Sequence, residues 1–169
     1  MRWLVDGYNV IRRDADLRSA EAGGLQAGRS ALLGLIAPVA RRLSDRFTVV
    51  FDGAPTAGAA ATPGRLEVIF SRPPDKADDV LIRLARQAGD GAAVVSDDRT
   101  VADAARRAGC AVISAADFIA ALSFADDARD DATEDDDDDA GAPKRGNPRR
   151  LSKDARAAQR ALRRLRGRE

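Results

Sequence analysis

Histidine is absent from this sequence of 169 residues, and cysteine occurs only once, as Cys110. Without histidine, hydrolytic chemistry must depend on carboxylates, bound metals, serine, tyrosine or lysine. A single cysteine excludes a disulfide framework within one chain and is typical of proteins from a reducing compartment. Cys110 lies in the apolar stretch CAVIS, where we expect it to be a small core residue.

Long apolar runs are missing as well. No run approaches the roughly 20 apolar residues that span a bilayer, and Asp6 comes too early for the apolar segment of a signal peptide. We therefore expect a cytoplasmic protein without a membrane partner. The Gly-x-x-x-x-Gly-Lys-Ser/Thr motif does not occur, which excludes the P-loop nucleotide enzymes.

Charge is distributed unevenly, although the formal net charge is only +1. Residues 126–139 (DDARDDATEDDDDD) carry 10 acids and one arginine, whereas residues 143–169 carry 11 basic and 2 acidic residues. Such a dense acidic run is typical of a disordered linker. We expect a folded domain over 1–124, an acidic linker over 125–142 and a basic, partly helical arm over 143–169.

Short apolar segments alternate with helical patterns from the N-terminus to residue 122. The expected strands are 3–5, 47–51, 66–70, 92–95 and 110–113, and the expected helices are 27–43, 77–87, 100–108 and 115–122. This alternation predicts an α/β fold with a mostly parallel sheet that helices cover on both faces.

Acidic side chains follow three of the expected strands where these end, and two more stand at the start of the helix after the expected strand 66–70. They are Asp6, Asp52, Asp78, Asp79, Asp97 and Asp98. Ligands of open parallel sheets bind beyond the carboxyl ends of the strands, so these acids are expected to converge at one edge. Crowded carboxylates repel one another, and Mg²⁺ or Mn²⁺ removes that conflict. Each acid alone also suits a turn or a helix N-cap, so the convergence is what favours a metal site.

The first of these acids belongs to the segment VDGYNVI. We expect Asp6 to hold the cation, and Asn9 to orient a ligand, a water or a neighbouring acid from the next turn. Gly7 is expected to permit a sharp turn after the strand. Phosphatases of the haloacid dehalogenase type also use acids at strand ends, but they need an Asp-x-Asp pair, and Tyr8 stands in the second position.

Four segments, in this order, resemble the YacP-like NYN family of the PIN-like nuclease superfamily: VDGYNVI, VVFDG, KADDVLIRLAR and VVSDDRTVADAARRAGCAVISAADF. The resemblance covers roughly residues 1–122. It implies a Rossmann-like α/β/α sandwich with a mostly parallel sheet, whose acidic cluster binds Mg²⁺ or Mn²⁺ and cleaves RNA.

The resemblance also implies roles for individual residues. The implied catalytic residues are Asp6, Asn9, Asp78 and Asp98, and the implied metal ligands are Asp6, Asp52, Asp78, Asp97 and Asp98. The family pattern aligns best when Ser96 and Asp98 take its Thr and Asp positions. Asp98 is therefore preferred to Asp97 as the acid that faces the metal.

Basic side chains are candidate RNA contacts. Those expected to flank the metal site are Arg65, Arg72, Lys76 and Arg99, and those in the basic arm are Lys144, Arg145, Arg149, Arg150, Arg156, Arg160, Arg163 and Arg164. Each also fits an ordinary solvated surface charge. Tyr8 or Trp3 would stack on a base, although Trp3 better suits the core.

A metal-dependent endoribonuclease is the leading interpretation, and an RNA-binding module of the same fold with weak or no catalysis is the alternative. RNA is the expected partner in both cases, and the Leu/Ala face of the basic arm would also suit a ribosome contact. The acidic run either competes with RNA for the arm or serves as an extended spacer. The sequence leaves the target RNA and the oligomeric state open.

Overall fold

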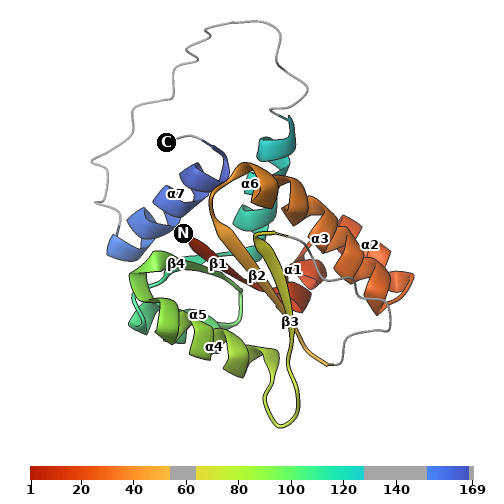
Figure 1. Cartoon of the computed structure of the whole chain (residues 1–169), viewed down its shortest axis with the longest axis horizontal. Coiled ribbons are helices and arrows are strands. Elements are labelled where there is room, and N and C mark those ends of the chain that lie inside the picture. Colours follow the sequence, from red (N-terminus) through yellow and green to blue (C-terminus); the bar gives the residue numbers. More distant parts are fainter. Residues whose placement is uncertain (54–63, 128–151, 168–169) are drawn as a thin grey trace, which may run out of the picture.

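A five-stranded parallel sheet forms the centre of the protein, in a computed structural model that describes residues 1–53, 64–127 and 152–167 (Figure 1). The strands are β1 (Arg2–Asp6), β2 (Arg46–Phe51), β3 (Leu66–Phe70), β4 (Ala92–Val95) and β5 (Ala111–Ile113). Their spatial order is β3-β2-β1-β4-β5, and every neighbouring pair is parallel. The predicted fold class is thus confirmed.

Helices cover both faces of this sheet. They are α1 (Gly7–Arg13), α2 (Ala15–Ala22), α3 (Leu25–Arg42), α4 (Ala77–Ala88), α5 (Arg99–Arg107), α6 (Ala115–Asp127) and α7 (Lys153–Leu165), with a short 3₁₀ turn, η1 (Gly89–Gly91), after α4. In Figure 1, α4 and α5 lie on one face, and α1, α3 and α6 lie on the other. Among the described residues, no helix combines the length and apolar character needed to cross a membrane.

Alternate residues of β1 supply the two cores. Trp3 and Val5 point to the side of α3 and α6, whereas Leu4 points to the side of α4 and α5, and all three are fully buried. Trp3 stacks on Phe47 at 5.8 Å between ring centroids and lies 5.9 Å from Phe118. The indole is therefore a core group and is not available to stack on a base.

Two helices between β1 and α3 were not expected from the sequence. Each is short, and each begins with an aspartate N-cap, whose carboxylate accepts backbone N–H groups of the first turn. Asp6 caps α1 through Asn9, and Asp14 caps α2 through Asp16 and Leu17. Because α1 starts directly after β1, it keeps its first turn at the carboxyl end of the sheet.

The helix of the basic arm packs into the folded domain. Ala161 and Leu165 of α7 are fully buried and share the core that contains Trp3 and Phe118. The sequence-based boundaries treated residues 143–169 as an arm outside a domain that ends at residue 124, so the structure differs on this point. The greater part of the expected acidic linker, residues 128–142, lies outside the described residues.

A buried carboxylate anchors α7 to the amino end of the sheet. The side chain of Asp45 is fully buried and lies 2.8 Å from Arg164 Nη2. The same carboxylate accepts hydrogen bonds from the Trp3 indole at 3.0 Å and from the Met1 amino group at 2.8 Å. Burial alone would raise the pKa of Asp45, but the hydrogen bonds from Arg164, Met1 and Trp3 together lower it.

Candidate active site

Four of the predicted acids line one open cavity of about 500 Å³ at the carboxyl end of the sheet. They are Asp6, Asp52, Asp78 and Asp98, and Tyr8, Asn9, Arg12 and Arg13 complete the lining. Three of the acids end or follow a strand, and the fourth lies in the first turn of α4. Parallel strands bring their carboxyl ends to the same edge, which is why residues so distant in the sequence meet here.

Asp6 is the most buried of these acids, with 7% of the residue exposed. Its carboxylate accepts the Ser96 hydroxyl at 2.9 Å and the Asn9 backbone N–H at 3.2 Å. Burial is the main reason that the pKa of Asp6 is raised to about 6; the charges of Asp78 and Asp52 add to its effect, and these two hydrogen bonds oppose it. Without a cation, a proton therefore competes for this carboxylate near neutral pH.

Gly7 follows Asp6 and opens α1. We expected it to permit a sharp turn, but it is not among the glycines with positive φ. Instead, a methyl group at this position would overlap the ring of Phe51, which is fully buried. The residue is constrained by space, because the start of α1 passes directly over that ring.

Asp52 and Asp78 also line the cavity. Asp52 accepts the Ser71 hydroxyl at 2.8 Å and the Ala77 backbone N–H at 2.7 Å, which ties the end of β2 to the start of α4. In the part of the chain that the structure describes, the Asp78 carboxylate has no ion pair or hydrogen bond. Burial raises the pKa of Asp78, and the charges of Asp98 and Asp52 raise it further.

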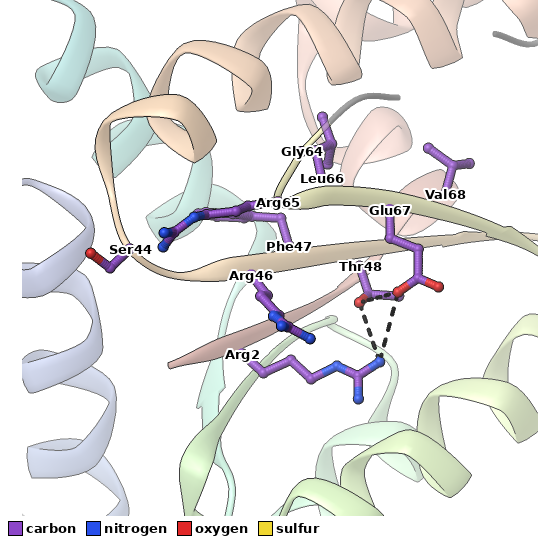
Figure 2. A pocket seen from close by; sticks show the side chains of 10 residues that line it. All are labelled: Arg2, Ser44, Arg46, Phe47, Thr48, Gly64, Arg65, Leu66, Glu67 and Val68. Carbon is purple, nitrogen blue, oxygen red and sulfur yellow. Dashed lines mark hydrogen bonds and ion pairs between the residues drawn. The ribbon is translucent and has the colours of Figure 1, made fainter. Parts of the chain in front are cut away.

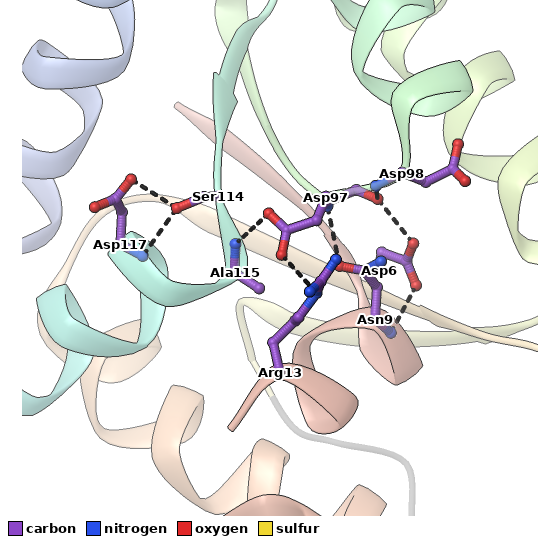
Figure 3. A network of polar contacts seen from close by, with 9 residues as sticks. Asp6, Asn9, Arg13, Asp97, Asp98, Ser114, Ala115 and Asp117 are labelled. Atoms are coloured by element: carbon purple, nitrogen blue, oxygen red, sulfur yellow. Dashed lines mark hydrogen bonds and ion pairs between the residues drawn. The ribbon is translucent and has the colours of Figure 1, made fainter. Parts of the chain in front are cut away.

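Asp97 and Asp98 turn in opposite directions after β4 (Figure 3). Asp98 lines the cavity and caps α5 by accepting N–H groups of the following turn. Asp97 is not part of the lining; it pairs with Arg13 at 3.1 Å and accepts the Ala115 N–H at 3.2 Å. The geometry therefore favours Asp98 as the acid that faces a bound cation.

Asn9 links α1 to the loop that carries these two acids. Its side-chain oxygen accepts the Asp97 backbone N–H at 2.9 Å. Ser96 forms a parallel link, because its hydroxyl donates to Asp6 and accepts the Asp98 N–H at 3.1 Å. Asn9 thus orients a neighbouring acid through its backbone, one of the roles anticipated for it.

No three Asp, Glu, His or Cys side chains among the described residues are already grouped to hold a metal ion. Carboxylate oxygens of Asp6, Asp52 and Asp98 already accept hydrogen bonds from neighbouring residues and are oriented by them. The donors nevertheless fit Mg²⁺ or Mn²⁺, which prefer oxygen ligands and keep several waters. Four carboxylates around an open cavity suit an ion that is held partly through water.

Comparison with known families now decides the identity of the fold. The model of the YacP-like NYN domain matches residues 3–164. The chain belongs to this family. The predicted resemblance is thereby confirmed, and the match extends past residue 122 to include nearly all of α7. NYN domains are a PIN-like nuclease family, so the protein has a nuclease-like fold.

Individual relatives agree with this assignment. The curated "Uncharacterized protein YacP" of Bacillus subtilis (strain 168) is 33% identical over 85 residues, which cover 49% of this chain and 50% of that protein. The alignment thus spans about half the length of this relative. The crystal structure of Rae1 (YacP) from Bacillus subtilis is 26% identical, with a TM-score of 0.63, and covers 76% of this chain and 79% of that one. A crystal structure of a mutant form of Rae1 is 24% identical with the same TM-score, over 80% and 86% of the two chains.

Sequence reasoning overlooked a buried arginine of this NYN domain that packs among aromatic rings, of which Tyr8 lines the cavity. Arg29, only 5% exposed, donates to the Tyr8 hydroxyl at 2.8 Å. Its guanidinium lies 5.0–5.6 Å from the ring centroids of Tyr8, Phe51 and Phe70. Its position in the sequence could have indicated that it is buried, because Arg29 lies three residues before the core residue Leu32 and so on the same face of an expected helix.

The predicted RNA contacts fall in several places. Arg72, Lys76 and Arg99 are exposed in segments that follow the carboxyl ends of strands, as expected. Arg65 is not near the acids, because it precedes the parallel strand β3 and so lies at the amino end of the sheet. On α7, Arg156, Arg160 and Arg163 are exposed, whereas Arg164 binds buried Asp45. Outside the described residues lie Lys144, Arg145, Arg149 and Arg150.

Proposed function

We propose that this NYN protein is a metal-dependent endoribonuclease that hydrolyses RNA phosphodiester bonds at the acidic cavity. The observation that carries the proposal is the meeting of four carboxylates from separate elements in one open cavity. The pKa of two of them, Asp6 and Asp78, is raised mainly by burial, and the repulsion from neighbouring acids acts in the same direction. Such crowding favours a divalent cation, and the nuclease-like family supports the reaction class.

The cation is Mg²⁺ or Mn²⁺, and when bound it supplies charge neutralisation at the phosphate and activation of a water. Asp6, Asp78 and Asp98 would hold it, directly or through water, with Asp52 as a fourth donor. Asp6 would have to release any proton that it carries near its pKa of about 6. Asn9 keeps the loop before α5 in place through the Asp97 N–H.

RNA is the proposed substrate, and the cytoplasm the proposed location. Arg12 lines the cavity, and Arg72 and Lys76 are exposed between β3 and α4, so these side chains are placed to contact phosphates. The exposed arginines of α7, Arg156 and Arg160 among them, form a separate basic surface for RNA or for a ribosome.

Incubation of the full chain with total RNA and Mg²⁺ or Mn²⁺, followed by mapping of the new RNA ends, tests this function. Cleavage should require the cation and should fall at least ~100-fold in Asp6→Asn. Asp16→Asn is the matched control, because it removes the same charge from an exposed position on α2 and should cleave normally. Wild-type cleavage by Asp6→Asn would exclude the acidic cavity as the active site.

An RNA-binding module of the same fold is the second candidate. It is favoured by one observation: among the described residues, no three metal-binding side chains are already grouped. Calorimetric titration of Mn²⁺ into wild type and Asp6→Asn separates the two candidates. A nuclease should lose Mn²⁺ affinity in the variant, whereas similar curves would favour the binding module.

A further inference from the structure

A second cavity, of about 800 Å³, lies at the opposite end of the sheet from the acids (Figure 2). It is formed by the beginnings of β1, β2 and β3, three neighbouring strands. Because the strands are parallel, their amino ends share this edge. The charge here is reversed: the cavity is lined by Arg2, Arg46 and Arg65, with Glu67 as the single acid of its lining.

The three arginines come from adjacent positions of neighbouring strands. Arg2 and Arg46 are partners in the register of β1 and β2. Arg65 immediately precedes β3, and its carbonyl oxygen accepts the N–H of Phe47 at 2.7 Å, next to Arg46. Like charges opposite each other on neighbouring strands destabilise a sheet. The repulsion between these arginines therefore lowers the stability of the sheet, and an anionic ligand would relieve it.

The protein compensates this charge only in part. Arg2 lies 3.9 Å from the Glu67 carboxylate and donates to the Thr48 hydroxyl at 3.5 Å, both long contacts. Within the described parts of the chain, the side chains of Arg46 and Arg65 have no ion pair or hydrogen bond, and both residues are exposed. Their planar guanidinium groups are suited to bind phosphate oxygens through paired N–H donors.

We propose that this cavity binds phosphate groups of the RNA at a second point, remote from the acidic cavity. The identity of the ligand as RNA rests on the proposed function. The edge strand β3 links the two sites: it begins after Arg65 and ends before Ser71, whose hydroxyl donates to Asp52. Its 5 residues extend about 16 Å, so an RNA longer than a few nucleotides reaches both cavities.

Binding without cleavage tests this site. The probe is a labelled single-stranded RNA of about 20 nucleotides, longer than typical single-strand binding sites of ~4–16 nucleotides, titrated in EDTA and read by fluorescence anisotropy over a range of salt concentrations. Arg46→Ala/Arg65→Ala should bind on the order of tenfold more weakly at ~0.1 M salt. The slope of log K against log salt should also fall by about 1.4, since each phosphate contact to a single strand contributes ~0.7.

The control is Arg86→Ala/Arg107→Ala, which removes the same charge from exposed positions on α4 and α5. An equal loss of affinity in both double variants would overturn the proposal, because it would reflect net charge alone. Inorganic pyrophosphate provides a second arm: if it binds and is lost in Arg46→Ala/Arg65→Ala while RNA binding is unchanged, the site belongs to a small phosphate ligand and not to RNA.

Two further measurements keep the outcomes distinct. Arg46→Ala/Arg65→Ala should unfold at the same urea concentration as wild type or at a higher one, since both side chains are exposed and their removal relieves repulsion between like charges. If it unfolds at a lower one, Arg65→Glu alone replaces it and should weaken RNA binding more than Arg107→Glu. The arginine effect should persist in Asp6→Asn. If the wild-type background shows the arginine effect on RNA binding but does not cleave RNA, the nuclease proposal alone is refuted. If it cleaves RNA but shows no arginine effect, the second site alone is refuted.

Discussion

Two buried aspartates stand at opposite ends of the sheet, and the protein treats them differently. At the amino end, Asp45 is fully buried and is surrounded by donors: the Arg164 guanidinium, the Met1 amino group and the Trp3 indole. At the carboxyl end, Asp6 is nearly as buried, but from the residues that the structure describes it accepts only one hydroxyl and one backbone N–H, and it shares its cavity with other carboxylates.

Their pKa values shift in opposite directions as a result. Burial raises the pKa of both groups, but the hydrogen bonds from Arg164, Met1 and Trp3 outweigh it at Asp45 and lower that pKa. At Asp6, burial prevails and the neighbouring acids add to it. The comparison shows that burial alone does not assign a role. Removing a buried carboxylate whose partners belong to the protein destabilises the fold, whereas a buried carboxylate surrounded by like charge is relieved by a proton or by a cation.

The largest expected effect tests the amino end. Asp45→Ala should lower the free energy of unfolding by about 3–5 kcal/mol, because it leaves Arg164 and the Trp3 N–H without their buried acceptor. Urea denaturation measures the change. Asp103→Ala, which breaks ion pairs between exposed side chains on α5, should cost less than about 1 kcal/mol. Equal losses in the two variants would show that buried Asp45 stabilises the fold no more than an exposed ion pair does.

The pH dependence of stability tests the carboxyl end. The folded pKa of Asp6, about 6, lies above its ordinary value of 3.8. The folded state thus favours the protonated form of Asp6. The resulting contribution to the free energy of unfolding is complete below pH 3.8 and is lost as the pH rises through about 6. A rise of the pKa from 3.8 to about 6 corresponds to roughly 3 kcal/mol. Asp45 has the opposite sign: its contribution is present above its unfolded pKa and is lost as the pH falls through its lower folded pKa.

Urea unfolding in EDTA between about pH 4 and 7 should therefore show a falling component in wild type that Asp6→Asn lacks. At pH 7 the variant should be the more stable of the two, by up to the same ~3 kcal/mol. Added Mn²⁺ should stabilise wild type by preferential binding to the native state and should affect the variant much less. Parallel pH profiles would show that Asp6 carries no unfavourable charge.

A third variant tests the packing beneath the cavity. Gly7→Ala should lower the free energy of unfolding by about 1–3 kcal/mol, because the added methyl overlaps the Phe51 ring, which lies 5.2 Å from Tyr8 and 5.9 Å from Phe70 between ring centroids. Gly34→Ala is the control: it has open space on α3 and should stabilise by up to ~1 kcal/mol. A neutral Gly7→Ala would mean that the ring can move aside.

The sheet and the acidic cavity were predictable because both follow from local pattern and topology. Apolar segments such as Phe47–Phe51 marked the strands, and an acid at the end of a parallel strand has to lie at the carboxyl edge. The same rule places Arg65 at the other edge, since it precedes its strand, and so contradicts its grouping with RNA contacts that flank the expected metal site.

Partnerships between distant charged residues were not predictable. Arg164 and Asp45 lie 119 residues apart, and neither segment carries a local sign of the other. The Leu/Ala face of the basic arm was visible as an amphipathic helix, but the periodicity of Ala161 and Leu165 does not reveal the surface that covers them. For buried Arg29, the position on the buried face of the helix was visible in the sequence, but the aromatic rings that surround it come from distant segments and were not.

The smallest expected effect separates a ligand-binding role from a structural one at the carboxyl end. Asn9→Ala removes the acceptor of the Asp97 N–H and should cost about 1 kcal/mol of unfolding free energy. Ser114→Ala should cost a similar amount, because it removes the acceptor of the Asp117 N–H at the start of α6 (Figure 3). Only Asn9→Ala should also weaken Mn²⁺ binding, since Asn9 lines the cavity and holds the loop before Asp98, whereas Ser114 does not line it. If calorimetry gave the same Mn²⁺ affinity for both variants, Asn9 would be a structural link like Ser114, and the ligand-dependent character of this end would rest on the carboxylates alone.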